Sequence, residues 1–331
     1  MASTSIRWGI IGAGIIAHKL AQAVQEDTDS ELVAVASRTP EKAAAFAAEF
    51  NIDACDYETL VSRADIDVVY IATTHNFHHD NARLALEHNK SVLVEKPFTV
   101  NADQASALIE LARARGVFLM EAIWTRFLPA QVNLKTQLDN GLIGDVRHLT
   151  FSFGAFVPPH YEKRLKDPNL AGGVTLDMGI YPLTFANFLL GERPETVKSM
   201  AEFGATGVDE LAMYLLRYPS GATASISTSC SLKMKPEATI YGTQGYVEYP
   251  GFQQGNRFVH HRHDGSNEVL SSQPFEYSHH ANGFVYQVAE VVGCLRAGQL
   301  ESAVIPLEET RSMMQLMDGM RAEWDFRYPF E

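Results

Sequence analysis

A glycine-rich segment near the start of the sequence constrains the fold more than any other part of it. Gly12, Gly14 and Ala17 form a G-x-G-x-x-A pattern that follows the apolar run 8–11 and opens a helix-like segment at 15–24. Strand, tight glycine turn and helix in this order are the context that the pattern needs to indicate dinucleotide binding. The sequence therefore predicts a dinucleotide-binding βαβ unit at its start.

The same segment has a second interpretation, a secretory signal peptide. Residues 8–17 are apolar, Arg7 precedes them, and residues 21–23 look like a cleavage site. Two glycines interrupt the apolar run, and His18 and Lys19 stand where it should continue, so we favour the dinucleotide pattern. No other run reaches the roughly 18 to 20 apolar residues of a membrane span. We therefore expect a soluble protein without a membrane partner.

Length, charge and cysteine content narrow the class of protein. The 331 residues, 46% of them hydrophobic, suggest about two domains with proper cores. The 27 basic and 40 acidic residues give a net charge of −13 without a basic tract, which argues against nucleic acid as a partner. Cys55, Cys230 and Cys294 form no C-x-x-C pair, so we expect a reducing, cytoplasmic setting without disulfides or zinc.

Apolar strands and amphipathic helices alternate through the first 120 residues. Further strands are predicted at 32–36, 68–72, 92–94 and 117–120, and helices at 40–50, 81–88 and 102–115. Continuous Val, Ile and Leu runs are typical of parallel strands that are covered on both faces. The predicted fold is an α/β Rossmann domain with a doubly wound parallel sheet, over residues 1–123.

The pattern changes after a predicted linking helix at 127–138. Strands are expected at 146–156, 197–203, 210–218, 222–230, 239–241 and 246–249, and helices only at 181–190, 283–296 and 307–323. Strands that follow one another without helices indicate a largely antiparallel sheet. We predict an α+β domain with a large, open, mostly antiparallel sheet for substrate binding and oligomerisation over residues 124–331, whose helix at 307–323 could pack back on the first domain.

The end of the second predicted strand indicates the cofactor. A carboxylate there would bind the ribose 2′-hydroxyl of NAD, whereas an arginine accommodates the 2′-phosphate of NADP. This strand runs into Ser37 and Arg38, and a guanidinium can pair with phosphate through two hydrogen bonds. We expect NADP rather than NAD. The alternative is that Arg38 is an ordinary solvated loop residue.

A lysine stands at the end of the strand predicted at 92–94, within Glu95-Lys96-Pro97. Open α/β sheets bind ligands at the carboxyl ends of their strands. Because Lys96 follows three apolar strand residues and precedes a proline, it is not an ordinary surface lysine. We predict that it is catalytic.

Four segments resemble, in their order, the glucose-fructose oxidoreductase/inositol dehydrogenase (Gfo/Idh/MocA) family. They are Gly12–Ala17, Ala72–His78, Glu95–Pro97 and Gly172–Tyr181. Residues 121–127, 181–182, 294–298 and 321–329 resemble in particular its branch of dimeric dihydrodiol dehydrogenases, also described as NADP-dependent D-xylose dehydrogenases. The resemblance covers essentially the whole chain and implies an NADP-dependent oxidoreductase.

The resemblance also implies a role for each matching residue. Gly12, Gly14, Ile15 and Ile16 would surround the pyrophosphate, Ser37 and Arg38 the adenosine phosphate, Thr73, Thr74, Asn76 and His78 the middle of the cofactor, and Glu95 and Lys96 the nicotinamide end. Many family members have histidine at the position of Tyr181, whereas the dihydrodiol dehydrogenase branch has tyrosine. The tyrosine supports this branch and changes the proton chemistry.

Alcohol oxidation needs a group that takes the hydroxyl proton while hydride leaves for the nicotinamide. Tyr181, with Asp177 beside it, is the candidate. A free tyrosine has a pKa of about 10, so a tyrosine base near neutral pH needs about 4 kcal/mol of stabilisation. The ammonium of Lys96 can supply much of it. Asp177 could share a helix face with Tyr181, although Pro182 favours a helix that begins only at Tyr181.

Aromatic and basic residues are the candidates for the substrate pocket: Trp124, Arg126, Phe153, Phe156, His160 and Tyr161. Aromatic walls suit a sugar or a cyclic dihydrodiol. Arg126 could hold substrate oxygens or pair with Glu121. Histidines gather at 75–79, 260–263 and 279–280 without suitably spaced partners, so no metal site is expected. The two later clusters are predicted to lie in loops.

These observations predict an NADP-dependent dehydrogenase or reductase for a secondary alcohol of a sugar, cyclitol or vicinal diol. Three alternatives are a reductase of an anhydro-keto sugar, a non-catalytic NADP-binding regulatory protein, and a glycosidase that retains NAD. Lys96, Asp177 and Tyr181 argue against the regulatory protein, and Arg38 argues against the glycosidase.

The strand predicted at 210–218 carries apolar side chains on both of its faces. Leu211, Met213 and Leu215 point to one face, and Ala212, Tyr214 and Leu216 to the other. A sheet with one wet face should alternate polar and apolar residues, so we expect both faces to be buried. Helices would cover one face and a second copy the other, which predicts a homodimer. The alternative is burial by loops around 253–273.

Overall fold

The computed structural model describes residues 5–266 and 268–331. The chain divides into two compact units, Met1–Trp124 with His280–Gln315, and Thr125–His279 with Leu316–Glu331. Each unit combines two separate stretches of the sequence, and helix α10, Leu307–Glu323, belongs to both. The assignment of cofactor binding to residues 1–123 and of substrate binding to residues 124–331 stays a prediction.

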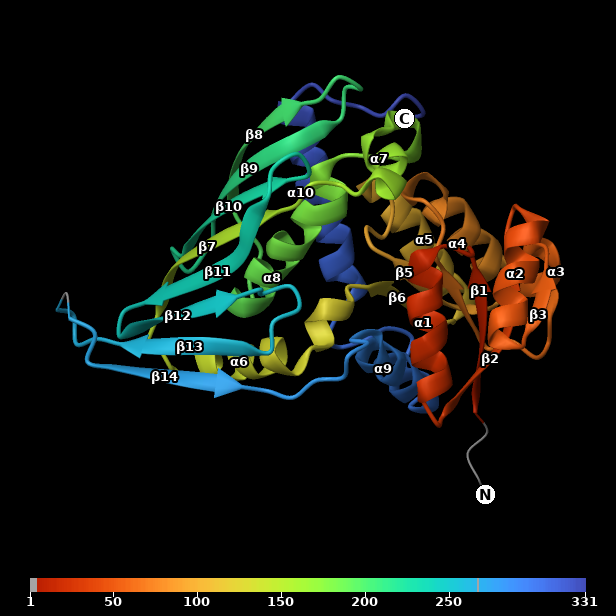
Figure 1. The fold of residues 1–331 in the computed structure, drawn as a ribbon, viewed down its shortest axis with the longest axis horizontal. Helices are drawn as coiled ribbons and strands as arrows, with labels where there is room; N and C mark the ends of the chain where they lie inside the picture. The colour runs from red at the N-terminus through yellow and green to blue at the C-terminus, as the bar shows by residue number, and fades with distance from the viewer. Residues whose placement is uncertain (1–4, 267) are drawn as a thin grey trace. The chain divides into compact units, whose positions relative to one another are not determined.

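The first unit contains a six-stranded sheet with the strand order β3-β2-β1-β4-β5-β6. Its strands are β1 Ile6–Ile11, β2 Ser30–Ala36, β3 Asp53–Cys55, β4 Val68–Ile71, β5 Ser91–Glu95 and β6 Leu119–Ala122. All neighbouring strands are parallel. The order reverses between β1 and β4, which is the switch point where doubly wound sheets bind ligands. The predicted Rossmann fold is confirmed (Figure 1).

The helices of this unit connect the parallel strands. They are α1 Ile15–Glu26, α2 Pro40–Phe50, α3 Tyr57–Ser62, the one-turn η1 His75–Phe77, α4 His78–Glu87 and α5 Ala102–Arg115. A further helix, α9 Phe284–Arg296, comes from far along the chain and packs against α1. The predicted bounds of α2 and α5 are confirmed. The side chain of Asn101 caps the start of α5, and Gly116 ends it in the left-handed conformation.

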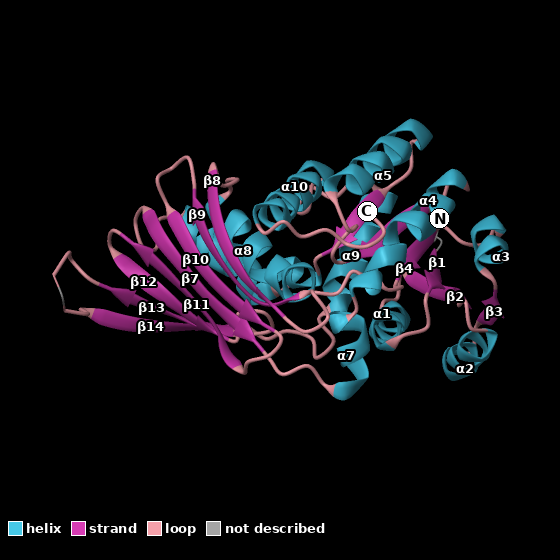
Figure 2. Ribbon diagram, turned by 90° about the horizontal axis from the view of Figure 1, so that it is seen from above, coloured by secondary structure: helices cyan, strands magenta, loops and turns pink. Residues whose placement is uncertain are grey.

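The second unit contains an eight-stranded sheet with the order β14-β13-β12-β11-β7-β10-β9-β8. Its strands are β7 Val146–Gly154, β8 Thr196–Phe203, β9 Asp209–Arg217, β10 Thr223–Ser229, β11 Met234–Gly242, β12 Gly245–Pro250, β13 Arg257–Arg262 and β14 Ser271–Glu276. β7 and β10 are parallel, and the other neighbours are antiparallel. The predicted mostly antiparallel sheet is confirmed (Figure 2).

The remaining helices are α6 Pro129–Asp139, α7 Pro159–Lys166 and α8 Ile180–Leu190, with single turns at Trp124–Phe127 and Pro168–Leu170. α8 packs against β7 and β10. A π-helical turn, Thr175–Gly179, leads directly into α8. The expectation that a helix begins only at Tyr181 is therefore wrong. Pro182 stands in the first turn of α8, where a missing backbone N–H is tolerated.

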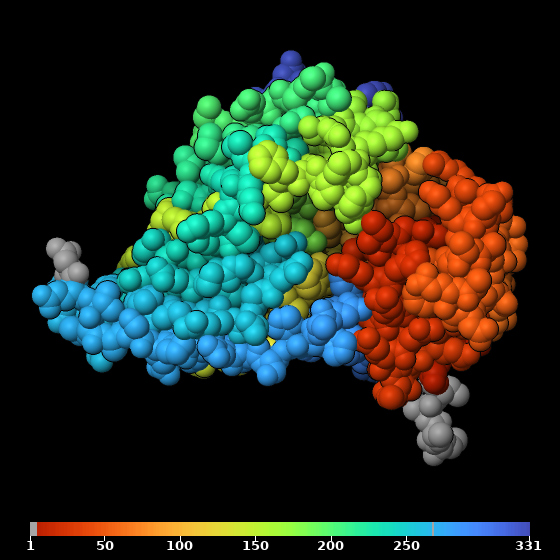
Figure 3. Space-filling model, in the orientation of Figure 1, coloured from red at the N-terminus to blue at the C-terminus, as the bar shows by residue number. Residues whose placement is uncertain are grey.

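Residues 253–273, predicted to form loops, contain β13 and the start of β14, and His260 and His261 lie on β13. Both loop predictions are wrong for these residues. The two strands are polar, and Pro274 lies in the terminal strand of the sheet, a position that tolerates proline. They therefore lack the apolar alternation that marks a half-buried strand. In Figure 3 the strands β8 to β14, green to blue, form one continuous surface.

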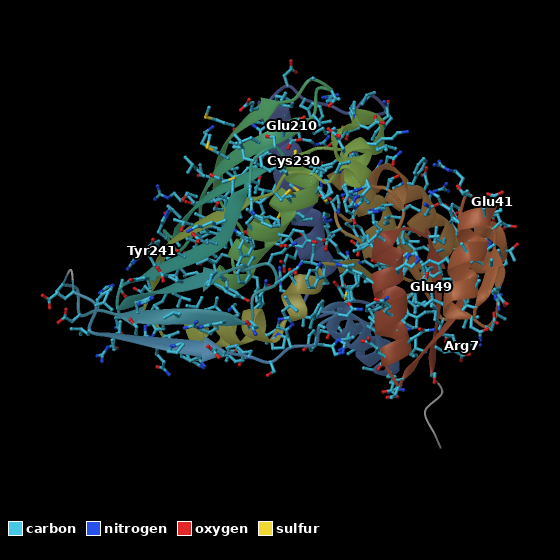
Figure 4. The ribbon with its side chains drawn as sticks, viewed as in Figure 1. Arg7, Glu41, Glu49, Glu210, Cys230 and Tyr241 are labelled. Atoms are coloured by element: carbon cyan, nitrogen blue, oxygen red, sulfur yellow. The ribbon has the colours of Figure 1, made fainter. Side chains whose placement is uncertain are left out.

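Strand β9 buries one face within the chain and leaves the other open. Ala212, Tyr214 and Leu216 are at most 2% exposed, whereas Met213 is 42% and Leu215 62% exposed. Tyr241 of β11, which Figure 4 labels, is likewise 41% exposed. Intrachain burial of this face by loops is therefore excluded for the described residues. Among those residues, no helix combines the length and apolar character that crossing a membrane requires.

Candidate active site

The glycine turn between β1 and α1 lets the backbone after β4 pass close to Gly12 and leaves open space at Gly14. Gly12 has a φ of 113°, and a Cβ there would lie 2.5 Å from the carbonyl oxygen of Ala72, whereas a Cβ on Gly14 would meet nothing within 4 Å. Helix α1 begins after Gly14 without a side-chain cap. The backbone N–H groups of its first turn, which includes Ile15 and Ile16, can therefore face an anion. This geometry fits a dinucleotide pyrophosphate.

Ser37 and Arg38 follow β2, as predicted. The guanidinium carbon of Arg38 lies 5.1 Å from the ring centroid of Phe77 in η1. Oγ of Ser37 accepts a hydrogen bond from the backbone amide of Thr39 at 3.2 Å. The structure thus brings Arg38 next to the turn after β4, from which four further cofactor candidates come.

Those four candidates, Thr73, Thr74, Asn76 and His78, lie in one connected turn after β4. Oγ1 of Thr74 donates to Oδ1 of Asn76 at 2.7 Å. The fully buried ring of His78 lies 2.8 Å through Nδ1 from the carbonyl oxygen of Pro97, and 3.1 Å through Nε2 from that of Thr73. His78 therefore ties the end of β4 to the turn after β5.

Lys96 stands in that turn after β5, and its bond to Pro97 is cis. The buried carboxylate of Glu95 accepts hydrogen bonds from the Tyr70 hydroxyl and, at 3.2 Å, from the Lys96 backbone amide. These contacts fix the backbone that carries the lysine.

A second buried carboxylate holds the other side of the turn. Glu121 of β6 accepts hydrogen bonds from the Phe98 amide at 3.0 Å and from the Thr310 hydroxyl at 2.9 Å. The supporting roles of Tyr70, Glu121 and Thr310 were missed by sequence reasoning. Two glutamates at the ends of apolar strands were the available signal.

The second unit carries Asp177 in the π-helical turn and Tyr181 at the start of α8. Arg164 of α7 forms an ion pair with Asp177 at 3.0 Å, and its guanidinium carbon lies 5.6 Å from the Tyr161 ring centroid. Asp177 and Arg164 side chains are only 13% and 27% exposed, so water screens the pair weakly. Sequence reasoning missed Arg164.

Aromatic rings lie next to Tyr181 and next to the ion pair of Asp177 with Arg164. The Tyr181 ring packs edge-on against Phe153 with centroids 6.1 Å apart, and His160 lies 4.5 Å from Tyr161. The structure therefore brings Phe153 into contact with Tyr181, and His160 into contact with Tyr161. Phe156, in contrast, is 66% exposed.

Arg126 and Trp124 have other surroundings. Buried Arg126 donates to the Thr184 carbonyl oxygen at 3.1 Å, and its guanidinium carbon lies 4.4 Å from the Phe188 ring centroid. Trp124, which belongs to the first unit, stacks on Phe284 with centroids 5.4 Å apart. Within the residues that the structure describes, no three His, Cys, Asp or Glu side chains form a group that could hold a metal.

Comparisons with known proteins agree with this fold. Residues 6–123 match the model of the oxidoreductase family with an NAD-binding Rossmann fold, GFO/IDH/MocA, and residues 132–248 match the model of its C-terminal domain. The chain is 36% identical to a trans-1,2-dihydrobenzene-1,2-diol dehydrogenase of Mus musculus, over 98% of both chains.

Two solved structures resemble the whole chain. A 3-ketoreductase from Actinomadura kijaniata, solved with NADP and TDP-benzene, has a TM-score of 0.86 and 25% identity over 96% of this chain and 98% of the other. An aldose-aldose oxidoreductase from Caulobacter crescentus, 23% identical over 98% of both chains, shares the fold with a TM-score of 0.86. The chain is thus an oxidoreductase with an NAD(P)-binding domain, and it belongs to the GFO/IDH/MocA family.

Proposed function

We propose that the protein is an NADP-dependent oxidoreductase that transfers hydride between the nicotinamide and a secondary alcohol of a sugar, cyclitol or trans-dihydrodiol. The observation that carries the proposal is Lys96 at the carboxyl end of β5. Two buried carboxylates, Glu95 and Glu121, fix the backbone of its turn. A lysine on a backbone that is fixed in this way, at the ligand-binding edge of a parallel sheet, is better placed for catalysis than for a role as a solvated surface residue.

Lys96 and Tyr181 are proposed as the proton-transfer pair. When bound, the cofactor accepts the hydride of the alcohol. Tyr181 takes the hydroxyl proton, and the ammonium of Lys96 stabilises the developing tyrosinate and hydrogen-bonds the substrate oxygen. In the reductive direction Tyr181 gives the proton back. Asp177 assists from the turn before Tyr181, where its ion pair with Arg164 limits its movement.

The choice of NADP rests on Arg38. Its guanidinium lies over the ring of Phe77 in η1, while its edge can donate two parallel hydrogen bonds to a 2′-phosphate. Gly12, Gly14, Ile15 and Ile16 would hold the pyrophosphate. Thr73, Thr74, Asn76 and His78 would form the wall between the phosphates and the nicotinamide.

The side chains around Asp177 and Tyr181 support the proposal of a cyclic polyol substrate. Phe153 and Tyr161 offer flat apolar faces for the C–H face of a ring, and Arg164 offers charged donors for its hydroxyls. Trp124, Arg126, Phe156 and His160 remain further candidates for substrate contacts.

A substrate panel tests this function. Purified protein is mixed with NADP⁺ or NAD⁺ and with trans-1,2-dihydrobenzene-1,2-diol, D-xylose and other aldoses, or inositols, and absorbance at the nicotinamide band is followed. An anhydro-keto sugar with NADPH covers the alternative reductase. We expect NADP⁺ reduction with at least one cyclic alcohol. Binding of NADP without turnover of any substrate would favour a regulatory protein.

We also propose that the protein forms a homodimer through the open face of its eight-stranded sheet. Met200 and Met213 are opposite each other on β8 and β9 and are 67% and 42% exposed, next to Leu215 at 62%. Large apolar side chains gathered on one flat sheet face mark an interface rather than a solvated surface. An isologous pair of such faces would bury both.

A further inference from the structure

A buried carboxylate outside the proposed proton-transfer pair contacts the segment that carries Tyr181. Asp209, the first residue of β9, is 2% exposed. Its Oδ2 accepts hydrogen bonds from the backbone amide of Thr175 at 2.7 Å and from the Thr175 hydroxyl at 2.5 Å. Burying a carboxylate is costly unless such hydrogen bonds compensate for lost water. The hydrogen bonds that compensate the buried Asp209 carboxylate therefore also fix the position of Thr175.

The backbone at Gly173, just before this helical segment, passes close to the same carboxylate. Gly173 has a φ of 121°, and a Cβ there would overlap Oδ1 of Asp209. The Tyr328 hydroxyl lies 3.5 Å from that Cβ position and donates to the carbonyl oxygen of Gly172 at 2.6 Å. Glycine at 173 therefore lets Asp209 reach the amide of Thr175.

Strand β9 holds Thr175 from a second side through Tyr214. The Tyr214 hydroxyl lies 2.8 Å from Oγ1 of Thr175 and 3.3 Å from Oγ1 of Thr228. Because the Thr175 hydroxyl donates its proton to Asp209, it accepts from Tyr214, which in turn accepts from Thr228. This chain of hydrogen bonds gives Thr175 one orientation.

Thr175 begins the π-helical turn that continues into α8. Asp177 and Tyr181 lie further along the same helical segment, with no loop between them and Thr175. A shift of Thr175 therefore shifts both side chains. Proton transfer depends strongly on such positions, because a displacement of about 1 Å can cost about a hundredfold in rate.

We propose that Asp209 is a positioning residue, which orients Asp177 and Tyr181 through its hydrogen bonds to Thr175. The inference rests on the proposed function, because it assumes that these two residues act in proton transfer. The carboxylate also places a negative charge at the amino end of the helical segment, where the helix dipole favours it. Asp209 thus acts on the reaction through the helix and not by touching the substrate.

Three variants test the link. Asp209→Asn removes the charge with little change in size, Thr175→Val removes the hydroxyl while it keeps the shape, and Thr175→Ser keeps the hydroxyl as the matched control. For the substrate of the panel that the wild type converts fastest, we expect Asp209→Asn and Thr175→Val to lower kcat by about tenfold to a hundredfold. KM and the NADP dissociation constant should stay within about threefold, as for a change in geometry rather than in binding. Thr175→Ser should retain wild-type kcat.

Amide hydrogen exchange of residues 172–181 supplies a readout that needs no substrate. The exchange should accelerate by about tenfold in Asp209→Asn and Thr175→Val, the effect of losing about 1.4 kcal/mol of local stability. It should not change in Thr175→Ser. Wild-type exchange in Asp209→Asn would overturn the proposal, and so would faster exchange with wild-type kcat. Equal losses in Thr175→Ser and Thr175→Val would rule out the hydroxyl as the link.

Tyr181→Phe, measured in parallel, separates the inference from the proposed function. If Tyr181→Phe loses turnover and Asp209→Asn does not, the positioning role is wrong and the proton-transfer role stands. If Tyr181→Phe keeps wild-type turnover, the proposed proton transfer is wrong and the positioning proposal falls with its premise. The exchange data then still decide whether Asp209 orders the segment.

Discussion

The guanidinium of Arg38 lies over the ring of Phe77, with 5.1 Å between its central carbon and the ring centroid. The two residues follow different strands, β2 and β4, on either side of β1. An exposed arginine samples many rotamers, and contact with a ring restricts them. A guanidinium stacked through one face keeps its edge donors for phosphate. The contact therefore restricts the Arg38 guanidinium while its edge donors stay open for the 2′-phosphate of the proposed NADP cofactor.

Replacing Arg38 by alanine should raise the KM for NADP and leave the KM for NAD nearly unchanged. A hydrogen bond to a charged group contributes about 1.5 to 3 kcal/mol, so the KM for NADP should rise by roughly tenfold to a hundredfold. Initial rates with both cofactors measure the effect. Equal use of NAD and NADP by the intact protein would contradict the assignment.

Replacing Phe77 by leucine should weaken NADP binding less than the loss of Arg38 does. A cation–π contact at an exposed site contributes about 0.5 to 1 kcal/mol, which corresponds to a rise of about twofold to fivefold in the KM for NADP. Phe77→Tyr is the matched control, since it keeps the ring. An equal rise in the KM for NAD would show that Phe77 supports the turn rather than Arg38.

Asp209 should make stability depend on pH. Burial raises its pKa from 3.8 to about 6, and the hydrogen bonds from Thr175 oppose this. The groups that face it are the hydroxyls of Thr175, Tyr214 and Tyr328, the Cys230 thiol beside Glu210 (Figure 4), and the Arg321 guanidinium.

Because the folded state binds the proton more tightly than the unfolded state, this contribution to stability is complete below about pH 4 and is lost as the pH rises through about 6. The free energy of unfolding of the wild type, relative to that of Asp209→Asn, should therefore fall by about 2 kcal/mol from pH 4 to pH 7. Urea unfolding of both proteins across this range measures the difference. A pH-independent difference would mean that Asp209 titrates normally.

Placing a charge on the open sheet face should separate the proposed dimer. Leu215→Lys at the centre of the exposed patch would bury two ammonium groups in an isologous interface. Light scattering at micromolar concentration should give a dimer for the wild type and 36.6 kDa, the mass of one chain, for the variant. Leu300→Lys, on an exposed leucine of the other unit, is the control. A wild-type protein that scatters as 36.6 kDa has no such dimer.

Local sequence signals were sufficient where one strand or helix determines its own structure. The apolar runs of β1, β4 and β5, the proline at the start of α2 and Gly116 at the end of α5 all act within a few residues. The short β3 and α3, with three and six residues, are too brief to show a period. β13 buries His260 beside Phe258, so its inward positions do not form an apolar alternation. β14 is the edge strand of the sheet and is mostly exposed.

The motifs of the candidate site could be predicted from the sequence, but the residues that hold those motifs in place could not. Gly12, Lys96 and Tyr181 stand in short patterns that can be read directly. Arg164 and Asp209, in contrast, reach their partners Asp177 and Thr175 across 13 and 34 residues. Such pairs exist only once the chain has folded, and a single sequence carries no local sign of them.

The pH dependence of turnover in Tyr181→Phe tests the central claim most directly. Steady-state oxidation of the best alcohol of the panel by NADP⁺ is measured across neutral pH for the wild type, Tyr181→Phe and Lys96→Met, together with the dissociation constant of NADP. We expect both variants to lose at least about a hundredfold in kcat, the scale of losing a general acid or base. Tyr181→Phe should bind NADP as the wild type does. Near-normal turnover of Tyr181→Phe across this pH range would contradict the proposed proton transfer.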